Sequence, residues 1–462
     1  MKGWPALLVV LGALGGGGAC KHAPDAVDGS SDIKDTSGSE TTGGMGSTTD
    51  PTTGGSCTTP CEPVRTLARV IAGEHCTCVL WEDASFRCWG DASERCTGWG
   101  DANIDNIGDN ETPASVGDVP APFALARLAL GAHSCAVTSA GEVRCWGDFA
   151  EGQLGLGTVD NTVFPVGAMD ALAVELGTNA VDVGIGNRYT CALTDAGSVR
   201  CWGLNDVGQL GLGHKMNIGD DEPPKAAGDL SLGGKAVQLV VTESHACALL
   251  ELGAVRCWGR GAFDEGTAGM LGYGSKEHVG DDELPSAVGP VDLPGPVERL
   301  ATGARHTCAV LRDGQMFCWG ANLYGQLGLG HTDDIGDDET PAVAGAVDVA
   351  PVIDLALYAN GTCVLFEDGT VQCWGDGLAG SHGHGHTNTL GDDELPATLP
   401  LLELGGGEFV QLAAGGAHVC ARTAEGVLRC WGFNHRGQLG YGHTMDIGDD
   451  ELPASAGPVQ YE

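Results

Sequence analysis

The chain has 462 residues, of which 62 are acidic and 23 basic, and its formal net charge at pH 7 is −39. A surface this negative repels a phosphate backbone, which argues against nucleic-acid binding. It also argues against docking on anionic lipid headgroups through basic patches, so we expect an acyl anchor to be the only membrane contact.

The amino terminus predicts export. Residues 1–19 have the features of a secretory signal peptide, with an apolar stretch from Ala6 to Leu14 that is too short to span a bilayer. The segment ending at Cys20 is similar to a bacterial lipobox, in which the cysteine is lipidated after cleavage, although Gly17 stands where that motif prefers leucine. We favour lipidation of Cys20 in a protein on the outer membrane or cell surface. The alternative is an ordinary secretory signal, which leaves Cys20 a free thiol.

Residues 20–63 are predicted to be a disordered linker. They consist mainly of Ser, Thr, Gly, Asp and Pro, so the segment cannot offset the entropy lost on folding. As a flexible coil, a segment of about 40 residues has a root-mean-square reach of roughly 35 Å. We therefore expect a tether that holds the folded part of the chain away from a membrane.

A cysteine pair recurs seven times in residues 64–462, each time as a cysteine, nine residues and a second cysteine that opens Cys-Trp-Gly. Successive pairs are 55 to 61 residues apart, and copies at such a period are typical of a solenoid, a propeller or an array. The pairs are Cys78 and Cys88, Cys135 and Cys145, Cys191 and Cys201, Cys247 and Cys257, Cys308 and Cys318, Cys363 and Cys373, and Cys420 and Cys430.

Each pair is predicted to bridge a β-hairpin. In the fifth copy, two runs of strand-forming residues flank an Asp-Gly step. Cys308 and Cys318 then lie opposite each other, where Cα atoms about 4.5 Å apart are compatible with a disulfide. Because side chains alternate across a strand, Trp319 faces the other way, and we expect it to pack between neighbouring sheets.

Two further blocks complete each copy. A strand-like run ending in glycine precedes the cysteines, and a glycine-rich block such as Gly203 to Gly213 follows them and is typical of a tight loop. The order Gly-x-x-His-Thr-Cys-Ala-Val-Leu, Cys-Trp-Gly-x-Asn-x-x-Gly-Gln-Leu-Gly-x-Gly and Pro-x-x-Val resembles the repeat of the regulator of chromosome condensation family over residues 64 to 460. The resemblance implies an all-β, seven-bladed β-propeller with about four antiparallel strands per blade. Which strand closes the ring is left open.

The remaining cysteines also favour disulfides. Apart from Cys20 and the seven pairs, the 19 cysteines include Cys57, Cys61, Cys76 and Cys96. Four cysteines allow three pairings, and we favour Cys76 with Cys96 and Cys57 with Cys61. A metal site would need Cys-x-x-Cys knuckles, which the sequence lacks. Disulfides belong to oxidising compartments, so the cysteines support export.

Six copies carry Gly-Asp-Asp-Glu or a near variant before a proline, and copy two lacks it. A loop at one position per blade should place these acidic clusters on one rim, where carboxylates suit a hard cation such as Ca²⁺. We favour the alternative that the Asp residues bond their own turn and keep the surface soluble. The candidate cation ligands are Asp220, Glu222, Asp281, Glu283, Asp337, Glu339, Asp392, Glu394, Asp449 and Glu451.

Histidines recur just before the first hairpin cysteine in five copies, and such repetition around a ring is typical of a structural role. A second group lies in copy six, where His382 and His384 align with leucines of copy five. On one strand face they could chelate a transition metal, but we favour chance drift in that copy. The five repeated histidines are His75, His133, His245, His306 and His418.

No nucleophile, metalloprotease or Walker motif occurs, so we expect no enzymatic activity, no catalytic residue and no cofactor. The only sizeable insertion, Gly261 to Met270 in copy four, is a reasonable place for a partner contact. We predict a monomeric, surface-displayed lipoprotein scaffold that binds a protein or glycan through a propeller face. The family resemblance implies two alternatives: nucleotide exchange on a small GTPase, which export argues against, and inhibition of an enzyme such as a β-lactamase.

Overall fold

The computed structural model describes residues 65–93, 95–100, 105–158, 165–263 and 269–462. The signal peptide, Cys20, the linker, Cys57 and Cys61 lie outside the described residues. The chain divides into two units, 1–65 and 66–462, and the second unit contains all seven repeats. Among the described residues, no helix combines the length and the apolar character that a membrane span requires.

Each repeat folds into one antiparallel sheet, here called a blade and numbered in chain order. The strands are β1 (Leu67–Ala72), β2 (Cys76–Trp81) and β3 (Phe86–Gly90) in blade 1; β4 (Leu125–Ala129), β5 (His133–Thr138), β6 (Val143–Gly147) and β7 (Leu172–Ala173) in blade 2; β8 (Ala180–Ile185), β9 (Tyr189–Thr194) and β10 (Val199–Gly203) in blade 3; β11 (Ala236–Val241), β12 (His245–Leu250) and β13 (Val255–Gly259) in blade 4; β14 (Val297–Thr302), β15 (His306–Leu311) and β16 (Met316–Gly320) in blade 5; β17 (Val352–Tyr358), β18 (Gly361–Phe366) and β19 (Val371–Gly375) in blade 6; and β20 (Phe409–Ala414), β21 (His418–Thr423) and β22 (Leu428–Gly432) in blade 7.

The helices are single turns in the segments that follow the third strands. Most begin at a proline, whose fixed φ suits the first helical position. They are the α-helices α1 (Pro113–Val116), α2 (Pro285–Val288) and α3 (Pro341–Ala344), and the 3-10 helices η2 (Ala168–Asp170), η3 (Pro224–Ala226), η4 (Leu378–Gly380), η5 (Pro396–Thr398) and η6 (Pro453–Ala456).

The second strand of each blade is buried along almost its whole length, because it lies between two other strands and between the neighbouring blades. In β15, for example, all residues from His306 to Leu311 are buried. Such a strand needs small or apolar side chains on both faces, which explains the Cys-Ala-Val-Leu run.

A disulfide joins the second and third strands of every blade. The two cysteines face each other in register, as Cys308 does Cys318, and their Cα atoms are 4.1 Å apart in all seven hairpins. This separation is slightly shorter than the 4.5 Å expected for such a strand pair. The bridges join Cys78 with Cys88, Cys135 with Cys145, Cys191 with Cys201, Cys247 with Cys257, Cys308 with Cys318, Cys363 with Cys373, and Cys420 with Cys430.

The blades have fewer strands than the sequence predicted. Within the described residues six blades are three-stranded, and a fourth strand, β7, is present in blade 2. Elsewhere the chain returns to the third strand through a single bridge, such as Gly203 with Ile218. A later residue adds one backbone hydrogen bond, as from the N–H of Leu230 to the C=O of Val199 at 2.9 Å. The intervening segment is rich in glycine and turns, so it does not extend the ladder.

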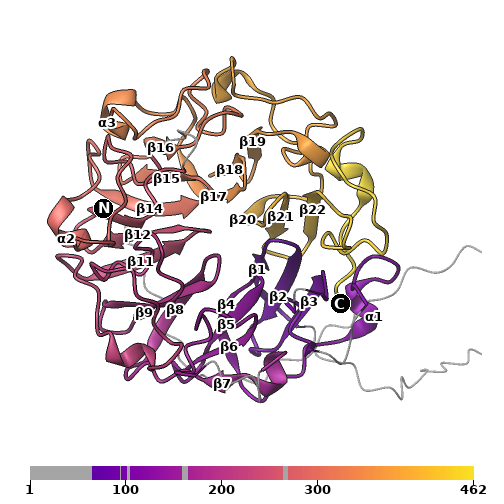
Figure 1. The fold of residues 1–462 in the computed structure, drawn as a ribbon. Helices are drawn as coiled ribbons and strands as arrows, with labels where there is room; N and C mark the ends of the chain where they lie inside the picture. Colours follow the sequence, from indigo (N-terminus) through magenta and orange to yellow (C-terminus); the bar gives the residue numbers. More distant parts are fainter. Residues whose placement is uncertain (1–64, 94, 101–104, 159–164, 264–268) are drawn as a thin grey trace, which may run out of the picture. The chain divides into compact units, whose positions relative to one another are not determined.

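The first strands of neighbouring blades lie side by side around a common centre (Figure 1). Contacts join β4 to β8, β8 to β11, β11 to β14, β14 to β17 and β17 to β20. Contacts between β20 and β1 join blade 7 to blade 1. Within the described ranges no strand is exchanged at this closure, because the last residues run along blade 7, where the N–H of Val459 donates to the C=O of Leu428 at 2.9 Å.

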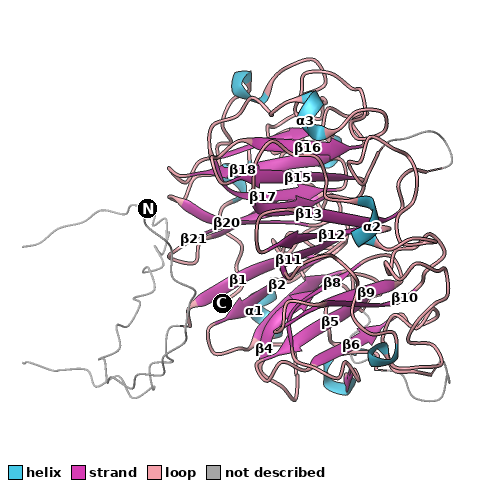
Figure 2. Ribbon diagram, turned by 90° about the vertical axis from the view of Figure 1, so that its left-hand side faces the viewer, coloured by secondary structure: helices cyan, strands magenta, loops and turns pink. Residues whose placement is uncertain are grey.

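Every blade has loops at two ends, between which its strands run (Figure 2). Because the strands are antiparallel, the turns between second and third strands lie at one end, here called the hairpin face. The loops between first and second strands, and those after Cys-Trp-Gly, lie at the other end, here called the funnel face. The sequence motifs that follow Cys-Trp-Gly therefore gather on the funnel face.

Candidate functional site

The tryptophan of Cys-Trp-Gly joins each blade to the preceding one. The indole N–H of Trp202 in blade 3 donates to the C=O of Gln153 in blade 2 at 2.9 Å. Trp319 is an exception among the described residues, since its buried indole N–H has no partner. Trp89, Trp146, Trp258, Trp374 and Trp431 make the equivalent bond to a backbone C=O, at 2.9 to 3.2 Å.

A buried asparagine shapes the glycine-rich block. The amide of Asn205 donates to the C=O of His214 at 2.6 Å and of Met216 at 3.0 Å, and its oxygen accepts the N–H of Leu210 at 3.0 Å. Asn322 and Asn434 repeat this arrangement in blades 5 and 7. The block therefore encodes a loop conformation, in which the polar side chains satisfy the backbone of their own loop.

The glycine-rich block packs against the acidic loop of the next blade. Gly208 in blade 3 has φ +79°, and a Cβ there would lie 2.4 Å from the backbone nitrogen of Asp281 in blade 4. The N–H of Gly213 donates to the C=O of Gly280 at 2.9 Å across the same boundary. Between blades 7 and 1, a Cβ on Gly437 would lie 2.5 Å from the nitrogen of Asp109. This contact, here called the glycine–acid interlock, needs glycine both for its positive φ and for the close backbone approach.

The acidic loops place three carboxylates close together in five blades. In each cluster the two Asp and the Glu offer oxygens that all lie within 4.8 Å of one another. All ten candidate cation ligands, from Asp220 to Glu451, belong to these clusters. A hard cation takes such oxygens. Calcium binding stays the less favoured of the two interpretations, and titration calorimetry with Ca²⁺ tests it directly.

Contacts within the protein already engage part of each acidic cluster. Lys215 of blade 3 pairs with Asp281 of blade 4 at 3.0 Å, and Lys276 of blade 4 pairs with Asp337 of blade 5 at 3.1 Å. Partial burial, together with the adjacent Asp carboxyl, raises the pKa of Glu222 to about 7. The pKa values of Glu339 and Glu451 are also raised to about 7, for the same reasons. The acidic loops therefore bridge blades whether or not they bind an ion.

Four of the five repeated histidines link neighbouring blades through a threonine, and the fifth, His75, instead has its Nε2 3.9 Å from Glu74 Oε1. His133 Nε2 lies 2.7 Å from Thr190 Oγ1, and that hydroxyl donates to the C=O of Gln153 at 2.9 Å. Because the hydroxyl has one hydrogen, His133 must donate from Nε2. Burial lowers the pKa of His133 to about 4, so the ring is neutral at pH 7. His245, His306 and His418 make the equivalent contact to Thr307, Thr362 and Thr77. These contacts give the histidines a structural role.

His382 and His384 do not share a strand face, contrary to the geometry expected from the sequence, because this part of blade 6 is a turn that follows η4. His382 is fully buried, and its Nε2 lies 2.7 Å from the C=O of Asn388. His384 Nε2 lies 3.2 Å from the C=O of Cys373. Burial lowers the pKa of both rings. One nitrogen of each ring is therefore committed to a backbone carbonyl, which argues against a shared metal.

A funnel of about 610 Å³ opens at the centre of the funnel face. The loops between first and second strands of all seven blades form its wall, mostly with glycine and alanine backbone. Glu74 and Glu243 also line it. Burial and the charge of Glu74 raise the pKa of Glu243, so the two carboxylates sense each other across the opening.

Large apolar side chains surround this funnel. The first residue after Cys-Trp-Gly donates its N–H to a funnel loop in every blade, at 2.8 to 3.1 Å, which ties the two sets of loops together. Leu323 and Leu378 on the outer loops are 66% and 68% exposed. Within the insertion of blade 4, Phe263 lies between Arg260 and Arg305, whose guanidinium carbons are 4.8 and 4.3 Å from its ring centre. Six blades contribute to this apolar ring, with Phe149, Leu204, Phe263, Leu323, Leu378 and Phe433.

The repeats are similar in sequence to a known domain family. A family model described as an RCC1-like domain matches residues 129–457. The chain belongs to the RCC1-like domain family. It is 31% identical over 322 residues to the ultraviolet-B receptor UVR8 of Arabidopsis thaliana, covering 68% of this chain and 66% of the receptor. It is also 30% identical over 312 residues to the human E3 ubiquitin-protein ligase HERC2, covering 67% of this chain and 6% of the ligase.

Solved structures agree on the fold of this RCC1-like domain. Prp20p of Saccharomyces cerevisiae matches with a TM-score of 0.60 at 20% identity, covering 84% of this chain and 87% of that one. Human WBSCR16 matches with a TM-score of 0.59 at 19% identity, covering 78% and 88%. The domain is therefore a β-propeller of the RCC1 type. The chain spans just under two thirds of the plant receptor and a small part of the ligase. The similarity therefore concerns the RCC1-like domain and not the whole of these relatives.

The joint between blades 1 and 2 of this RCC1-like domain is built differently. Blade 1 has Cys96 to Gly100 in place of the glycine-rich block, and blade 2 lacks the acidic loop. The two irregular segments meet, with the N–H of Ala168 donating to the C=O of Gly98 at 2.9 Å. The missing glycine-rich block of blade 1 and the missing acidic loop of blade 2 therefore explain each other, because a glycine–acid interlock needs both segments.

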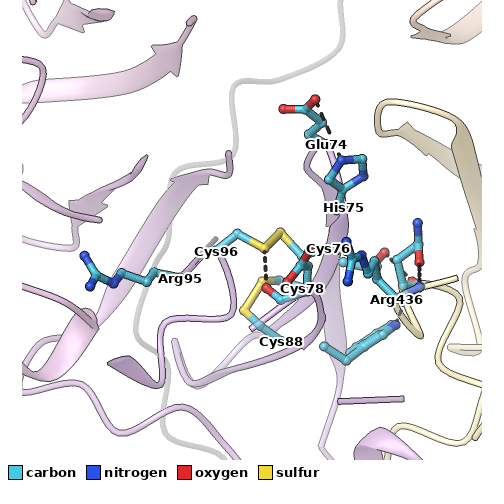
Figure 3. The surroundings of a disulfide bond; sticks show 12 residues. Glu74, His75, Cys76, Cys78, Cys88, Arg95, Cys96 and Arg436 are labelled. Carbon is cyan, nitrogen blue, oxygen red and sulfur yellow. Dashed lines mark hydrogen bonds and ion pairs between the residues drawn. A yellow bond between two sulfur atoms is a disulfide. The ribbon is translucent and has the colours of Figure 1, made fainter. Parts of the chain in front are cut away.

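A second disulfide stabilises blade 1 at this joint (Figure 3). Cys76 bonds Cys96, with Cα atoms 6.3 Å apart, beside the hairpin bridge of Cys78 with Cys88. This is the pairing that the irregular first copy predicted. Cys76 and Cys78 share one face of β2, since side chains alternate along a strand. All four cysteines are buried, so the pair of bridges is a structural feature.

Proposed function

We propose that this RCC1-like domain is a non-enzymatic scaffold that binds a protein partner through its funnel face. The single observation that supports this most is the apolar ring around the funnel. Exposed apolar side chains gathered on one face mark interaction sites in soluble proteins. Aromatic residues and arginine, as at Phe263 with Arg260 and Arg305, are enriched where interfaces are strongest.

The other repeated motifs support the same proposal by being engaged elsewhere. The tryptophans, the His–Thr pairs, the buried asparagines and the interlock glycines all make contacts within or between blades. In the apolar ring, Phe263 already packs against Arg305 of blade 5, whereas the side chains of Leu323 and Leu378 are exposed to solvent. Two large apolar side chains this exposed, both three residues after the glycine of Cys-Trp-Gly, therefore favour a partner.

We further propose that the chain is exported and displayed on a membrane through lipidated Cys20. The eight disulfides among the described residues support an oxidising compartment. Labelling cells with a radioactive fatty acid tests the anchor. We expect label on the unaltered protein and none on Cys20→Ala. An unlabelled wild-type chain would leave a secreted form.

A matched pair of variants tests the binding face. The double variant Leu323→Asp with Leu378→Asp places two charges on the apolar ring, whereas Leu252→Asp places one on the hairpin face at a side chain that is 86% exposed. In pull-downs from surface extracts, we expect the wild type and Leu252→Asp to retain the same protein and the double variant to lose it. Equal capture by all three would refute the funnel face as the binding surface.

The captured partner separates the remaining alternatives. A glycan partner would survive protease treatment of the extract, whereas a protein partner would not. If the partner is an enzyme whose activity falls on binding, the scaffold acts as an inhibitor. If it is a GTPase whose nucleotide release accelerates, exchange activity replaces the scaffold proposal.

A further inference from the structure

Two of the seven loops that line the funnel carry a glutamate. Glu74 in blade 1 and Glu243 in blade 4 both lie four residues before the first hairpin cysteine, and both side chains are exposed. No other residue at this position of the repeat is charged. The funnel is therefore lined by two carboxylates among small or uncharged residues, which in the other blades are Gly131, Asn187, Ala304, Ala359 and Gly416.

Backbone hydrogen bonds between neighbouring blades fix both glutamates at the mouth of the funnel. The C=O of Glu243 accepts the N–H of Asn187 in blade 3 at 2.9 Å. The C=O of Glu74 accepts the N–H of Gly416 in blade 7 at 3.2 Å. Blades 1 and 4 are three places apart in a ring of seven, so the two glutamates lie on nearly opposite sides of the opening. A ligand that enters the funnel therefore passes between two carboxylates.

The positive charges near the two glutamates neutralise them only in part. Glu74 Oε1 lies 3.9 Å from His75 Nε2, which is beyond hydrogen-bond length. The charge of Arg305 lowers the pKa of Glu243, but by less than the charge of Glu74 raises it, and the Arg305 guanidinium carbon lies 4.3 Å from the ring centre of Phe263. Among the described residues, no side chain or backbone group donates a hydrogen bond to either carboxylate. Both carboxylates are thus open to a cation from outside.

Apolar side chains line the funnel below the two glutamates. The first strands run toward the funnel face and their loops continue beyond them, so side chains at the strand ends lie deeper than those on the loops (Figure 2). Ile185 and Val241 are only half-buried there, which leaves apolar surface open to the funnel. This surface, here called the funnel floor, consists of Leu130, Ile185, Val241 and Leu357.

We propose that the funnel-face partner presents a loop in which basic residues flank an apolar one. The apolar side chain packs on the funnel floor, and the flanking lysine or arginine side chains pair with Glu74 and Glu243. Burial of apolar surface then supplies affinity, while the opposite charges at the mouth orient the loop. The net charge of −39 also favours encounter with a basic partner. This inference rests on the proposed function, because it specifies the chemistry of the same partner.

A cyclic hexapeptide that contains Lys-Leu-Lys and a dye label is the probe for the funnel, and fluorescence polarisation with the full mature chain measures its affinity. One twin of the probe has both lysines acetylated, and a second has glycine in place of leucine. We expect saturable binding of the probe that weakens as sodium chloride is added, and about fivefold weaker binding of either twin.

Glutamine variants of the protein test the two carboxylates separately. Glu74→Gln and Glu243→Gln should each weaken binding of the probe about threefold, and the double variant about tenfold. Glu367→Gln is the matched control, because Glu367 is exposed on the hairpin face and its replacement removes the same charge. Its affinity should equal that of the wild type, which separates the funnel from a general attraction between a basic peptide and an acidic protein.

Three results would overturn the proposal. The first is equal affinity of the double glutamine variant and Glu367→Gln for the probe, and the second is equal binding of the probe and its acetylated twin. The third is saturable binding of calcium chloride that the double variant abolishes, because an ion would then occupy the mouth of the funnel.

The pull-down from surface extracts distinguishes this inference from the proposed function. If the double glutamine variant retains the partner while Leu323→Asp with Leu378→Asp loses it, the funnel face binds a partner of other chemistry and only this inference fails. If the wild type captures no protein, the proposed function fails, and the peptide titration still shows whether the funnel recognises a basic and apolar segment.

Discussion

Replacing Gly208 by alanine should open one glycine–acid interlock. At φ +79° a Cβ is strained by about 1 to 2 kcal/mol, and the smaller entropy of the unfolded alanine chain offsets roughly half of this. The new Cβ would also lie 2.4 Å from the backbone nitrogen of Asp281 and 2.6 Å from the carbonyl carbon of Gly280. Both atoms belong to backbone, so the two loops must separate, which adds about 2 to 3 kcal/mol.

Gly228 provides a matched control for this prediction. It has the same φ, +79°, but a Cβ there would meet nothing within 4 Å. We expect Gly228→Ala to lower the free energy of unfolding by about 1 kcal/mol and Gly208→Ala by about 3 to 4 kcal/mol. Urea unfolding under non-reducing conditions, followed by tryptophan fluorescence, measures both, and the m-values should match the wild type. Equal losses in the two variants would refute the interlock, because only the backbone contact distinguishes them.

Three further outcomes follow from the contacts between blades. Trp202→Phe should lose about 1 kcal/mol more stability than Trp319→Phe, since only Trp202 donates an indole hydrogen bond; equal urea midpoints would contradict this. His133 has a folded pKa of about 4, below its unfolded value near 6.5, so the unfolded state binds the proton first and His133 should contribute about 2 kcal/mol to the stability lost between pH 7.5 and 5. In urea titrations at these two pH values, His133→Asn should reduce the loss by this amount, while the other buried histidines account for the rest. The raised pKa of Glu222 has the opposite sign between pH 4.5 and 7, but its carboxyl is largely solvated and the buried histidines should dominate. Cys76→Ser with Cys96→Ser should lose about 3 kcal/mol while non-reducing peptide mapping finds the seven hairpin bridges intact.

Local sequence patterns predicted what depends on neighbours within one repeat. The hairpin register follows from strand alternation, so Cys308 was expected opposite Cys318, and Trp319 on the other face. The Cys76–Cys96 pairing followed from two irregularities in one copy. These features depend on spacings of some ten to twenty residues, within which the backbone geometry of a hairpin is fixed.

Contacts one repeat away could not be predicted in the same way. The partner of His133 is Thr190, and nothing in either motif states that the histidine of one blade meets the threonine of the next. The sequence predicted a fourth strand in too many blades. A segment that forms one bridge, such as Gly203 with Ile218, has the same sequence pattern as a segment that forms a short strand. His382 was expected on a strand, yet the positive φ of its flanking glycines makes a turn.

Part of the candidate site had a signal that the sequence reasoning missed. Each member of the apolar ring lies within four residues of the glycine in Cys-Trp-Gly, as Leu323 does after Gly320. These loops are rich in glycine and polar residues, so a large apolar residue near their start stands out. Its meaning became clear only when the loops were seen to surround one funnel.

Blades 7 and 1 are the one pair of adjacent blades that no peptide segment connects directly. Gly437 nevertheless contacts Gly108 and Asp109 there, just as Gly208 contacts Gly280 and Asp281 between the directly connected blades 3 and 4. Peptide connectivity is therefore dispensable at that seam. A circular permutant with new ends between blades 1 and 2 would instead place its opening at the junction without an interlock. Such a cut should weaken the wheel more than the existing seam does.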